Sequence, residues 1–317
     1  MRYALMTEPQ QGLSYDEILA VARTAEEAGI EAFFRSDHYA SFPGGGGKPT
    51  TDAWATLAGL ARETSTIGLG VLVSPVTFRN PGNLAKVIQT VDEMSGGRVE
   101  AGFGAGWNQD EHAQLGLAFP HVGERFDMLE EQMAIIHGLW TEPDGWTFEG
   151  NHWQVRGSMR HGEIARGGRR HPHILFGGKG GPRLAALVAR YGDEFNLNSA
   201  SPDDAPPAIA RIRAACEEIG RDPDEVVYSA MTGVLVAETE EDLRTRVADL
   251  LAGFGQADVD GGEWLAERRK RWIMGTPDEA AARVSALERT GLERIMLQDF
   301  VPRDLDHVRL IGRVFAA

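Results

Sequence analysis

Eight apolar segments with the length and pattern of β-strands alternate with helical segments along almost the entire chain of 317 residues. Some of them, such as residues 67–73, IGLGVLV, are apolar or small at every position rather than at alternate ones. Strands of this kind are typical of a parallel sheet that is covered on both faces. Eight strand–helix units predict an α/β protein with a closed (β/α)8 barrel, and an open doubly wound sheet is the alternative. The predicted strands are residues 2–6, 32–35, 67–73, 98–103, 173–176, 194–197, 226–236 and 294–298.

Several helix starts are marked by residues whose side chains accept hydrogen bonds from the first amides of a helix. Ser14 and Thr276 are each followed three residues later by a glutamate, which predicts a capping box at both places. Asn80 precedes Pro81, and proline is common in the first helical position. Helices are predicted to begin after Ser14, Asn80, Ser201, Thr239 and Thr276. Other helices are predicted over 52–63, 123–140 and 182–191.

The sequence predicts one barrel domain over residues 1–317, with two interruptions of the alternating pattern. The first is an insertion at about 141–172, in which residues 146–155 predict a β-hairpin that turns at Gly150 and Asn151. The second is an irregular segment at about 253–275. A hydrophobic content of 42% is ample for the core of such a domain.

The chain carries 32 basic and 47 acidic residues, which gives a net charge of −15. This charge disfavours nucleic acids and anionic membranes as partners. A basic stretch lies within the first insertion, where it either guides an anionic ligand or is a solvated loop. Its arginines are Arg156, Arg160, Arg166, Arg169 and Arg170.

We expect the protein in the cytoplasm. Cys216 is the single cysteine, so an intrachain disulfide is excluded and a reducing compartment is indicated. The first residues predict a strand rather than an apolar signal segment, and no apolar run reaches the length that spans a membrane.

Polar residues that follow the predicted strands are the candidates for chemistry, because the active site of a (β/α)8 barrel lies at the carboxyl ends of its strands. Asp37 and His38 follow the second strand and form the best acid–base pair, since histidine titrates near neutral pH and a neighbouring carboxylate can tune it. Glu8, after the first strand, is a further catalytic candidate. Glu111 also follows a strand, the fourth, but no role is predicted for it.

Glycines end the fourth strand at alternate positions, Gly102, Gly104 and Gly106. Glycine lets backbone amides approach a flat ring or a phosphate closely, which favours a ligand site. A bulged strand end in a packed sheet gives the same pattern. Trp107 occupies the place of the third glycine of the dinucleotide fingerprint, so a Rossmann site has weak support.

A second glycine-rich turn, Gly177 to Gly181, precedes a predicted helix and contains Lys179, with Arg183 two residues beyond it. Free amides at a helix start attract an anion, and the two cations strengthen this, so the turn predicts a phosphate site. The alternative is a glycine-rich connection without a ligand. A Walker A pattern is absent.

Two other chemistries of barrel enzymes have little support. A Schiff-base aldolase needs a lysine on or at the end of a strand, and three of the four lysines fall in predicted loops or helices. The only His-x-His motif, His171 and His173, enters its strand at the end opposite to the predicted site. We therefore expect no catalytic metal.

Six motifs together resemble the luciferase-like monooxygenase superfamily and, within it, the coenzyme F420-dependent oxidoreductases. The resemblance extends over nearly the whole chain and implies a bacterial luciferase-like (β/α)8 barrel with insertions, a homodimer, and a flavin or deazaflavin at the carboxyl ends of the strands. The motifs are RSDH at 35–38, GVLVSP at 70–75, MSGGRVE at 94–100, GAGWN at 104–108, ERFD at 124–127 and FGG at 176–178.

The resemblance also implies roles for individual residues. Asp37 and His38 would face the deazaflavin ring, with His38 as proton donor or as stabiliser of the anionic ring. Val73 and Ser74 would form a bulge behind the ring, often with a non-prolyl cis peptide. The residues that would line the ring and its side chain are Gly104, Ala105, Gly106, Trp107 and Asn108, and those that would hold the phosphate are Gly177, Gly178, Lys179, Gly180 and Arg183.

Two positions depart from the sugar-phosphate dehydrogenases that the chain resembles. Those enzymes have a tryptophan four residues after the histidine and a glutamate after the Gly-x-Gly of the fourth strand, where this chain has Phe42 and Trp107. An aromatic mouth of Phe42, Trp107 and Trp54 suits an uncharged molecule better than a sugar phosphate.

The predicted function is therefore an F420-dependent oxidoreductase that transfers a hydride between the deazaflavin and a small uncharged organic substrate. The first alternative is a monooxygenase of the same fold that uses reduced FMN and oxygen. The second is a flavin-binding protein without catalytic activity.

Overall fold

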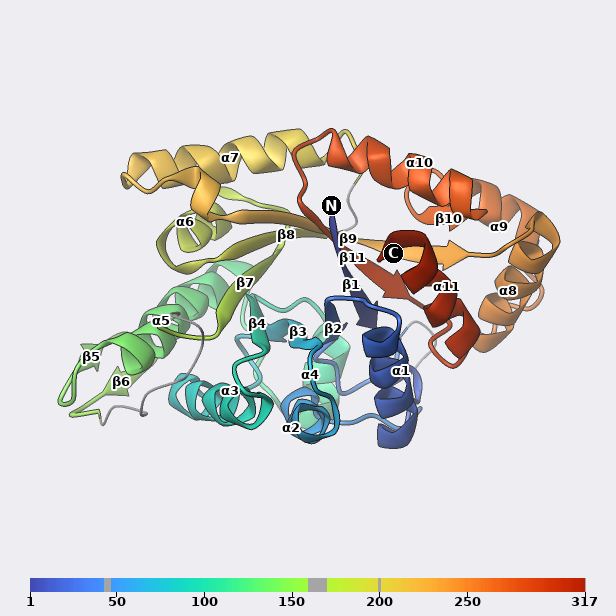
Figure 1. The fold of residues 1–317 in the computed structure, drawn as a ribbon. Helices are drawn as coiled ribbons and strands as arrows, with labels where there is room; N and C mark the ends of the chain where they lie inside the picture. The colour runs from blue at the N-terminus through green and yellow to red at the C-terminus, as the bar shows by residue number, and fades with distance from the viewer. Residues whose placement is uncertain (43–46, 159–169, 199–200, 317) are drawn as a thin grey trace.

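Eight parallel strands form a closed barrel in the computed structural model, which describes residues 1–42, 47–158, 170–198 and 201–316 (Figure 1). Each strand pairs with its neighbour in chain order, and the pair of β11 with β1 and the pair of β8 with β9 complete the ring. The predicted barrel is confirmed, and the open doubly wound sheet is wrong. The strands are β1 (Arg2–Thr7), β2 (Ala32–Arg35), β3 (Gly68–Pro75), β4 (Val99–Gly104), β7 (His173–Gly178), β8 (Glu194–Asn198), β9 (Val227–Val236) and β11 (Arg294–Asp299).

Alternate side chains of the strands pack into two separate apolar layers. Met6 and Phe34 belong to the cluster inside the barrel, whereas Leu5 and Phe33, one residue before each, belong to the layer between the strands and the helices. Both layers exclude solvent, so the strands are apolar on both faces. Gly70 leaves room for the Phe34 ring, because a Cβ at this glycine would lie 2.1 Å from Cε1 of Phe34.

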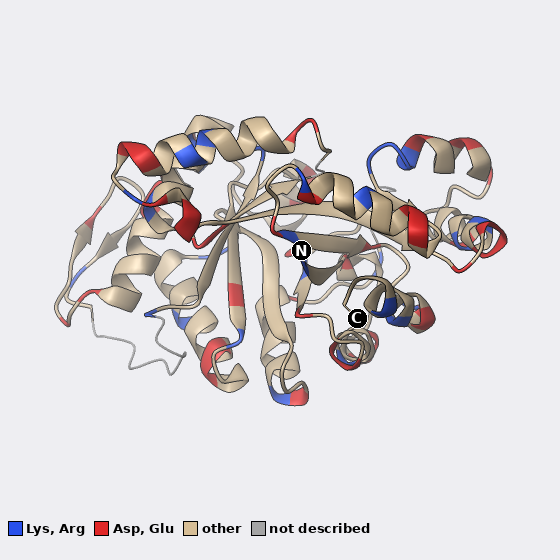
Figure 2. Cartoon of the chain, turned by 45° about the horizontal axis from the view of Figure 1, so that its top comes forward, with Lys and Arg blue, Asp and Glu red and all other residues tan. Residues whose placement is uncertain are grey.

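Helices surround the barrel, and the charged residues lie mainly on them and on the loops, while the strands are mostly uncharged (Figure 2). The described helices include none that is long and apolar enough to cross a membrane. Both predicted capping boxes, at Ser14 and Thr276, are present. The helices are α1 (Tyr15–Glu27), α2 (Ala53–Glu63), α3 (Pro81–Ser95), α4 (Gln109–Leu115), α5 (Val122–Thr141), α6 (Pro182–Tyr191), α7 (Ala205–Glu218), α8 (Glu240–Gly253), α9 (Gly261–Arg268), α10 (Pro277–Glu288) and α11 (Leu305–Phe315), with short 3-10 turns at Pro9–Gln11 and Pro223–Glu225.

The start of α7 differs from the prediction that placed it after Ser201. The hydroxyl of Ser201 donates to Asp204 in a turn, and the helix begins at Ala205. Pro206 and Pro207 explain the later start, since proline lacks an amide hydrogen and is tolerated only in the first turn of a helix.

The two interruptions of the barrel pattern have different outcomes. The hairpin is confirmed as β5 (Phe148–Glu149) paired with β6 (Gln154–Val155), and Glu131 of α5 accepts hydrogen bonds from three amides of its turn. Residues 253–275 are not irregular throughout, because they contain α9 and a short strand, β10 (Ile273–Gly275), that pairs with β9. Arg160, Arg166 and Arg169 of the basic stretch lie outside the described residues.

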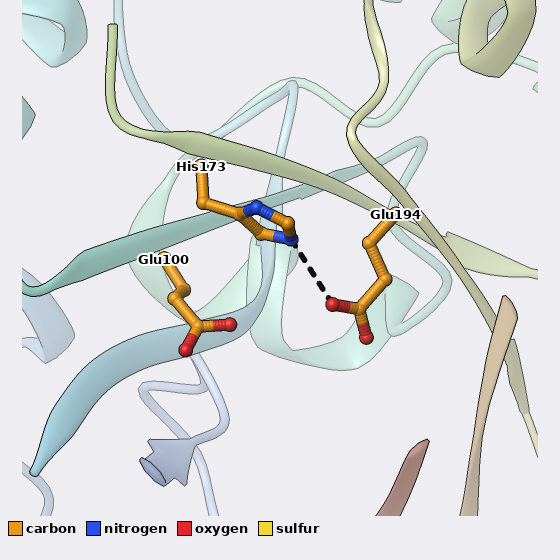
Figure 3. A group of neighbouring side chains, drawn as sticks. All are labelled: Glu100, His173 and Glu194. Carbon is orange, nitrogen blue, oxygen red and sulfur yellow. Dashed lines mark hydrogen bonds and ion pairs between the residues drawn. The ribbon is translucent and has the colours of Figure 1, made fainter. Parts of the chain in front are cut away.

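A cluster of charged side chains fills the barrel at the amino ends of its strands. His173 lies at this end, as the sequence analysis predicts. The guanidinium of Arg294, 2% exposed, forms ion pairs with Glu31, Glu100 and Glu194. Figure 3 shows His173 between Glu100 and Glu194, with its Nε2 3.0 Å from a Glu194 oxygen.

Atoms of Glu100, His173 and Glu194 lie within 4.8 Å of one another, a spacing that also suits a metal ion. Arg294 already pairs with both carboxylates, at 3.0 Å in the case of Glu194, so a positive charge already lies between them without a metal ion. We therefore interpret the group as a buried ionic network that stabilises the closed barrel.

This network makes stability depend on pH. Burial opposes the charged form of His173, but the hydrogen bond to Glu194 and the nearby carboxylates outweigh burial and raise the pKa of His173 above its ordinary 6.5. A histidine whose pKa rises on folding stabilises the protein fully below pH 6.5, and this contribution is lost as the pH rises through the folded-state pKa.

We expect His173→Gln, which keeps a donor for Glu194 but does not titrate, to flatten the pH dependence of stability above pH 6.5. The measurement is the urea midpoint of wild type and variant at several pH values from 6 to about 9, a range that spans the ordinary histidine pKa and values above it. The exposed His152→Gln is the matched control and keeps the wild-type slope. An unchanged slope in His173→Gln would contradict this role.

Candidate functional site

The polar residues selected from the sequence gather at one rim of the barrel. The parallel register sets Thr7 beside Arg35, Arg35 beside Val71, and Pro75 beside Gly104. The segments that follow β1, β2, β3 and β4 therefore leave the barrel at the same end. The predicted convergence of these segments at the carboxyl ends of the strands is confirmed.

His38 is paired with a carboxylate that the sequence analysis left without a role. Its Nδ1 lies 2.8 Å from Oε2 of Glu111, whose side chain is 1% exposed. The other oxygen of Glu111 accepts hydrogen bonds from the amides of Tyr39 and Ala40. A carboxylate surrounded by donors accepts a hydrogen bond from Nδ1–H, so this contact fixes the ring and leaves Nε2 for a ligand.

Glu111 escapes prediction because it belongs to α4, a helix that is not among those predicted from the sequence. The helix is only seven residues long and begins where the side chain of Asn108 accepts a hydrogen bond from the Glu111 amide. An asparagine cap three residues before a glutamate is the one local signal of this arrangement. The pairing with His38 crosses 73 residues of sequence and has no local signature.

Aromatic side chains surround the exposed edge of His38. The ring centroids of His38, Phe42 and Trp107 are 4.7 to 5.6 Å apart, and every pair meets edge to face. Trp107 is 62% exposed, which is unusual for so large an apolar side chain. The predicted aromatic mouth is present, but without Trp54, which lies 1% exposed on α2 and donates from its indole to Ser74 at 2.9 Å.

Asp37 lies beneath this mouth and is 2% exposed. Its carboxylate accepts hydrogen bonds from Ser74 at 3.0 Å and from two nitrogens of Arg79. Burial opposes the charge of Arg79, but the Asp37 carboxylate outweighs it and raises the arginine pKa. The structure thus shows Asp37 holding the β2 and β3 ends together, and its predicted contact with a ring remains a prediction.

The bulge expected in β3 is present. The register with β4 shifts between Val71 and Ser74, and the peptide between Leu72 and Val73 is cis. A Cβ atom added at any of three glycines would come too close to a methyl carbon of Val73. The distance between the two atoms would be 2.7 Å for Gly104, 2.8 Å for Gly177 and 3.0 Å for Gly102. These glycines thus make room for a bulged strand, the structural alternative considered for Gly102 and Gly104.

Arg125 of α5 holds the loop that follows β4. Its guanidinium donates to the carbonyl oxygens of Ala105 at 3.0 Å and Gly106 at 3.4 Å. Gly106 has a φ of 77°, a conformation that favours glycine. The loop is therefore fixed before any ligand binds, and the side chain of Asn108 serves as the cap of α4.

The glycine-rich turn between β7 and α6 retains part of the predicted phosphate site. No side chain caps the start of α6 at Gly181, and Lys179 is exposed. Gly180, with a φ of 64°, lies against Phe195. The guanidinium of Arg183 donates to Asp127 at 2.7 Å and Glu130 at 2.8 Å on α5, and its predicted contact with a phosphate remains a prediction.

Glu8 lies at the edge of the site rather than beside His38. Its two oxygens accept hydrogen bonds from the amides of Gln10 at 2.7 Å and Gln298 at 2.5 Å. Gln10 in turn accepts from the hydroxyl of Ser36, next to Asp37. Glu8 also borders a cavity of about 470 Å³ between β1, β11 and α8.

Comparison with known proteins places this geometry in context. The chain is 28% identical to the F420-dependent glucose-6-phosphate dehydrogenase of Amycolatopsis mediterranei, over 88% of this chain and 87% of the relative. It resembles the fold of an F420-dependent secondary alcohol dehydrogenase solved with an F420-acetone adduct, with a TM-score of 0.79 and 20% identity over 99% of this chain and 97% of the other. It also resembles the monooxygenase RslO1 of Streptomyces bottropensis, with a TM-score of 0.81 and 23% identity over 100% and 98% of the two chains.

The family model described as luciferase-like monooxygenase matches residues 1–297, a span that contains every candidate site residue described above. The β3 bulge and the pair of His38 and Glu111 lie within this match, which ends inside the last barrel strand, β11. The chain therefore belongs to the luciferase-like monooxygenase family.

Proposed function

We propose that the protein is an F420-dependent oxidoreductase that transfers a hydride between the deazaflavin and a small uncharged organic molecule. The observation that carries the proposal is the buried Glu111 carboxylate on Nδ1 of His38, beside the exposed aromatic mouth. The relatives named as F420-dependent dehydrogenases support the choice of coenzyme. The homodimer expected from the resemblance stays a prediction, since one chain is described.

The residues at the rim fit such a coenzyme. The side chain of Val73 packs against glycines of both β4 and β7. The bulge therefore forms one wall of the site, and these glycines add no side chains to that wall. The uncapped first turn of α6 and the exposed Lys179 fit a phosphate group. Gly104, Trp107 and Ser74 would then border the ring. When bound, the coenzyme would donate or accept a hydride, which is one proton with two electrons.

His38 would manage the proton that accompanies hydride transfer. Glu111 holds the Nδ1 proton, so Nε2 can accept the hydroxyl proton of an alcohol or, when protonated, donate one to a carbonyl oxygen. The negative charge of Glu111 stabilises the imidazolium form during this exchange. Asp37 and Arg79 keep the loop that bears His38 at a fixed place.

A monooxygenase that uses reduced FMN is the second candidate. It is favoured by the fold similarity to RslO1, which is as high as that to the F420-dependent alcohol dehydrogenase. A flavin-binding protein without activity would have no need for the His38 and Glu111 pair.

We expect the purified protein to bind F420 at least ten times more tightly than FMN in fluorescence titrations. Lys179→Ala should weaken F420 binding by about 1.4- to fivefold, because one exposed charge contributes about 0.2 to 1 kcal/mol. Lys86→Ala, an exposed lysine on α3, is the matched control and should bind as wild type does. Preference for FMN, with oxygen consumed in the presence of reduced FMN, would replace this proposal with the monooxygenase.

We expect Glu111→Gln to lower kcat for secondary alcohol oxidation by about 10- to 100-fold while the affinity for F420 stays unchanged. Nitrogen NMR of labelled histidine gives a second readout, in which the Nδ1-protonated form of His38 is lost in the variant. Asp110→Asn, one residue away and exposed, is the control. Unchanged kcat together with an unchanged histidine spectrum would rule out a positioning role for Glu111.

A further inference from the structure

The cavity of about 470 Å³ between β1, β11 and α8 has not entered the proposed function, although it adjoins the site. Gln11, which borders the cavity, donates from its amide to the carbonyl oxygen of Phe42 in the aromatic mouth. Glu8 borders the cavity and is linked through Gln10 to Ser36, two residues before His38. These hydrogen bonds connect the cavity wall to the segments that carry Phe42 and His38, although neither of these side chains lines the cavity.

One wall of the cavity is apolar and aromatic. Phe300 stacks on Trp272 at 4.9 Å between ring centroids, and Phe254 meets Phe300 edge to face at 6.0 Å. Leu250 and Val301 complete this wall. The wall offers a ligand both apolar contact area and the faces of aromatic rings, which attract organic cations.

The charged residues that border the cavity favour positive over negative ligands. Four carboxylates reach it, those of Glu8, Asp249, Asp299 and Asp304. Asp304 pairs with Arg246 at 2.9 Å, and Asp299 lies 3.2 Å from Nδ1 of His307. Glu8 has only neutral amides as partners, and Asp249 is exposed without an ion-pair partner in the described part of the chain.

The two cations at the cavity do not reverse this balance. Arg303 is committed to Glu17, at 2.6 Å, and Lys48 donates to the carbonyl oxygen of Gly253 at 3.2 Å. Glu8 and Asp249 thus oppose the single charge of Lys48. An anionic group in the cavity would meet repulsion from these carboxylates, whereas an ammonium group would be attracted.

We infer that this cavity is the substrate subsite and that it takes an apolar molecule bearing an amine, whose ammonium group lies near Glu8 and Asp249 while its other end extends toward His38. The inference rests on the coenzyme and the hydride transfer of the proposed function, and it replaces the uncharged substrate of that proposal with a cationic one. It excludes sugar phosphates and carboxylic acids as ligands of the cavity.

Three probes of equal length separate the charge classes: 3-phenylpropylamine, 3-phenylpropanol and 3-phenylpropanoate, with glucose 6-phosphate as a further anion. Calorimetric titration of the protein without coenzyme should give an affinity order of amine, alcohol, acid, with at least a tenfold difference between amine and acid. Tightest binding of the acid or of glucose 6-phosphate would overturn the inference.

Two variants test the location. Asp249→Asn should weaken amine binding three- to tenfold and leave alcohol binding unchanged, and the exposed Glu241→Gln on the same helix is its control. Val301→Trp, which fills the cavity, should abolish binding of both probes. Unchanged amine affinity in either variant would refute the subsite. The F420 titration is run on each variant, so failure of the subsite is distinguishable from failure of the coenzyme proposal.

Discussion

Closure of the parallel sheet is the constraint on which the rest of the molecule depends. Because β11 pairs with β1 and β8 with β9, every backbone group of the barrel strands can find a partner without an exposed sheet edge. Closure also brings residues from distant parts of the chain to one rim. Glu8 and Gln298, 290 residues apart, share a hydrogen bond for this reason.

The two ends of this barrel use buried charge differently. At the amino ends of the strands, Arg294 sits among three carboxylates, and the group is far from any residue proposed to handle a ligand. At the carboxyl ends, Arg79 pairs with both Asp37 and Asp52 beneath the loop that carries His38. A buried pair of this kind strongly restricts the conformation of the loop, because breaking it would leave one charge without a partner in a dry environment.

Much of the fold follows from local sequence, and much of the site does not. All eight barrel strands lie within two residues of their predicted bounds, since a strand buried on both faces is an unbroken apolar run. Two aromatic neighbours of His38, Phe42 and Trp107, were expected from the comparison with the family that the sequence resembles, whereas Trp54 lies in the core. The partners of the polar groups were not: Glu111, Arg79 and the pairing of Arg183 with α5 depend on contacts between separate elements, which periodicity and capping do not report. Short elements such as β10 are missed for a related reason, because three residues are too few to show a repeating pattern of apolar positions.

The segment around α8 and α9 has a hydrophobic core of its own. Leu243, Val247 and Leu251 of α8 pack with Leu265 and Met274 in a cluster separate from the large core of the barrel. The helix that forms one wall of the cavity is therefore supported by a small satellite unit. Leu235 of β9 belongs to the same cluster and joins this satellite unit to the barrel. His38 follows β2 and Glu111 lies on α4, so side chains of α8 can change without a direct change at that pair.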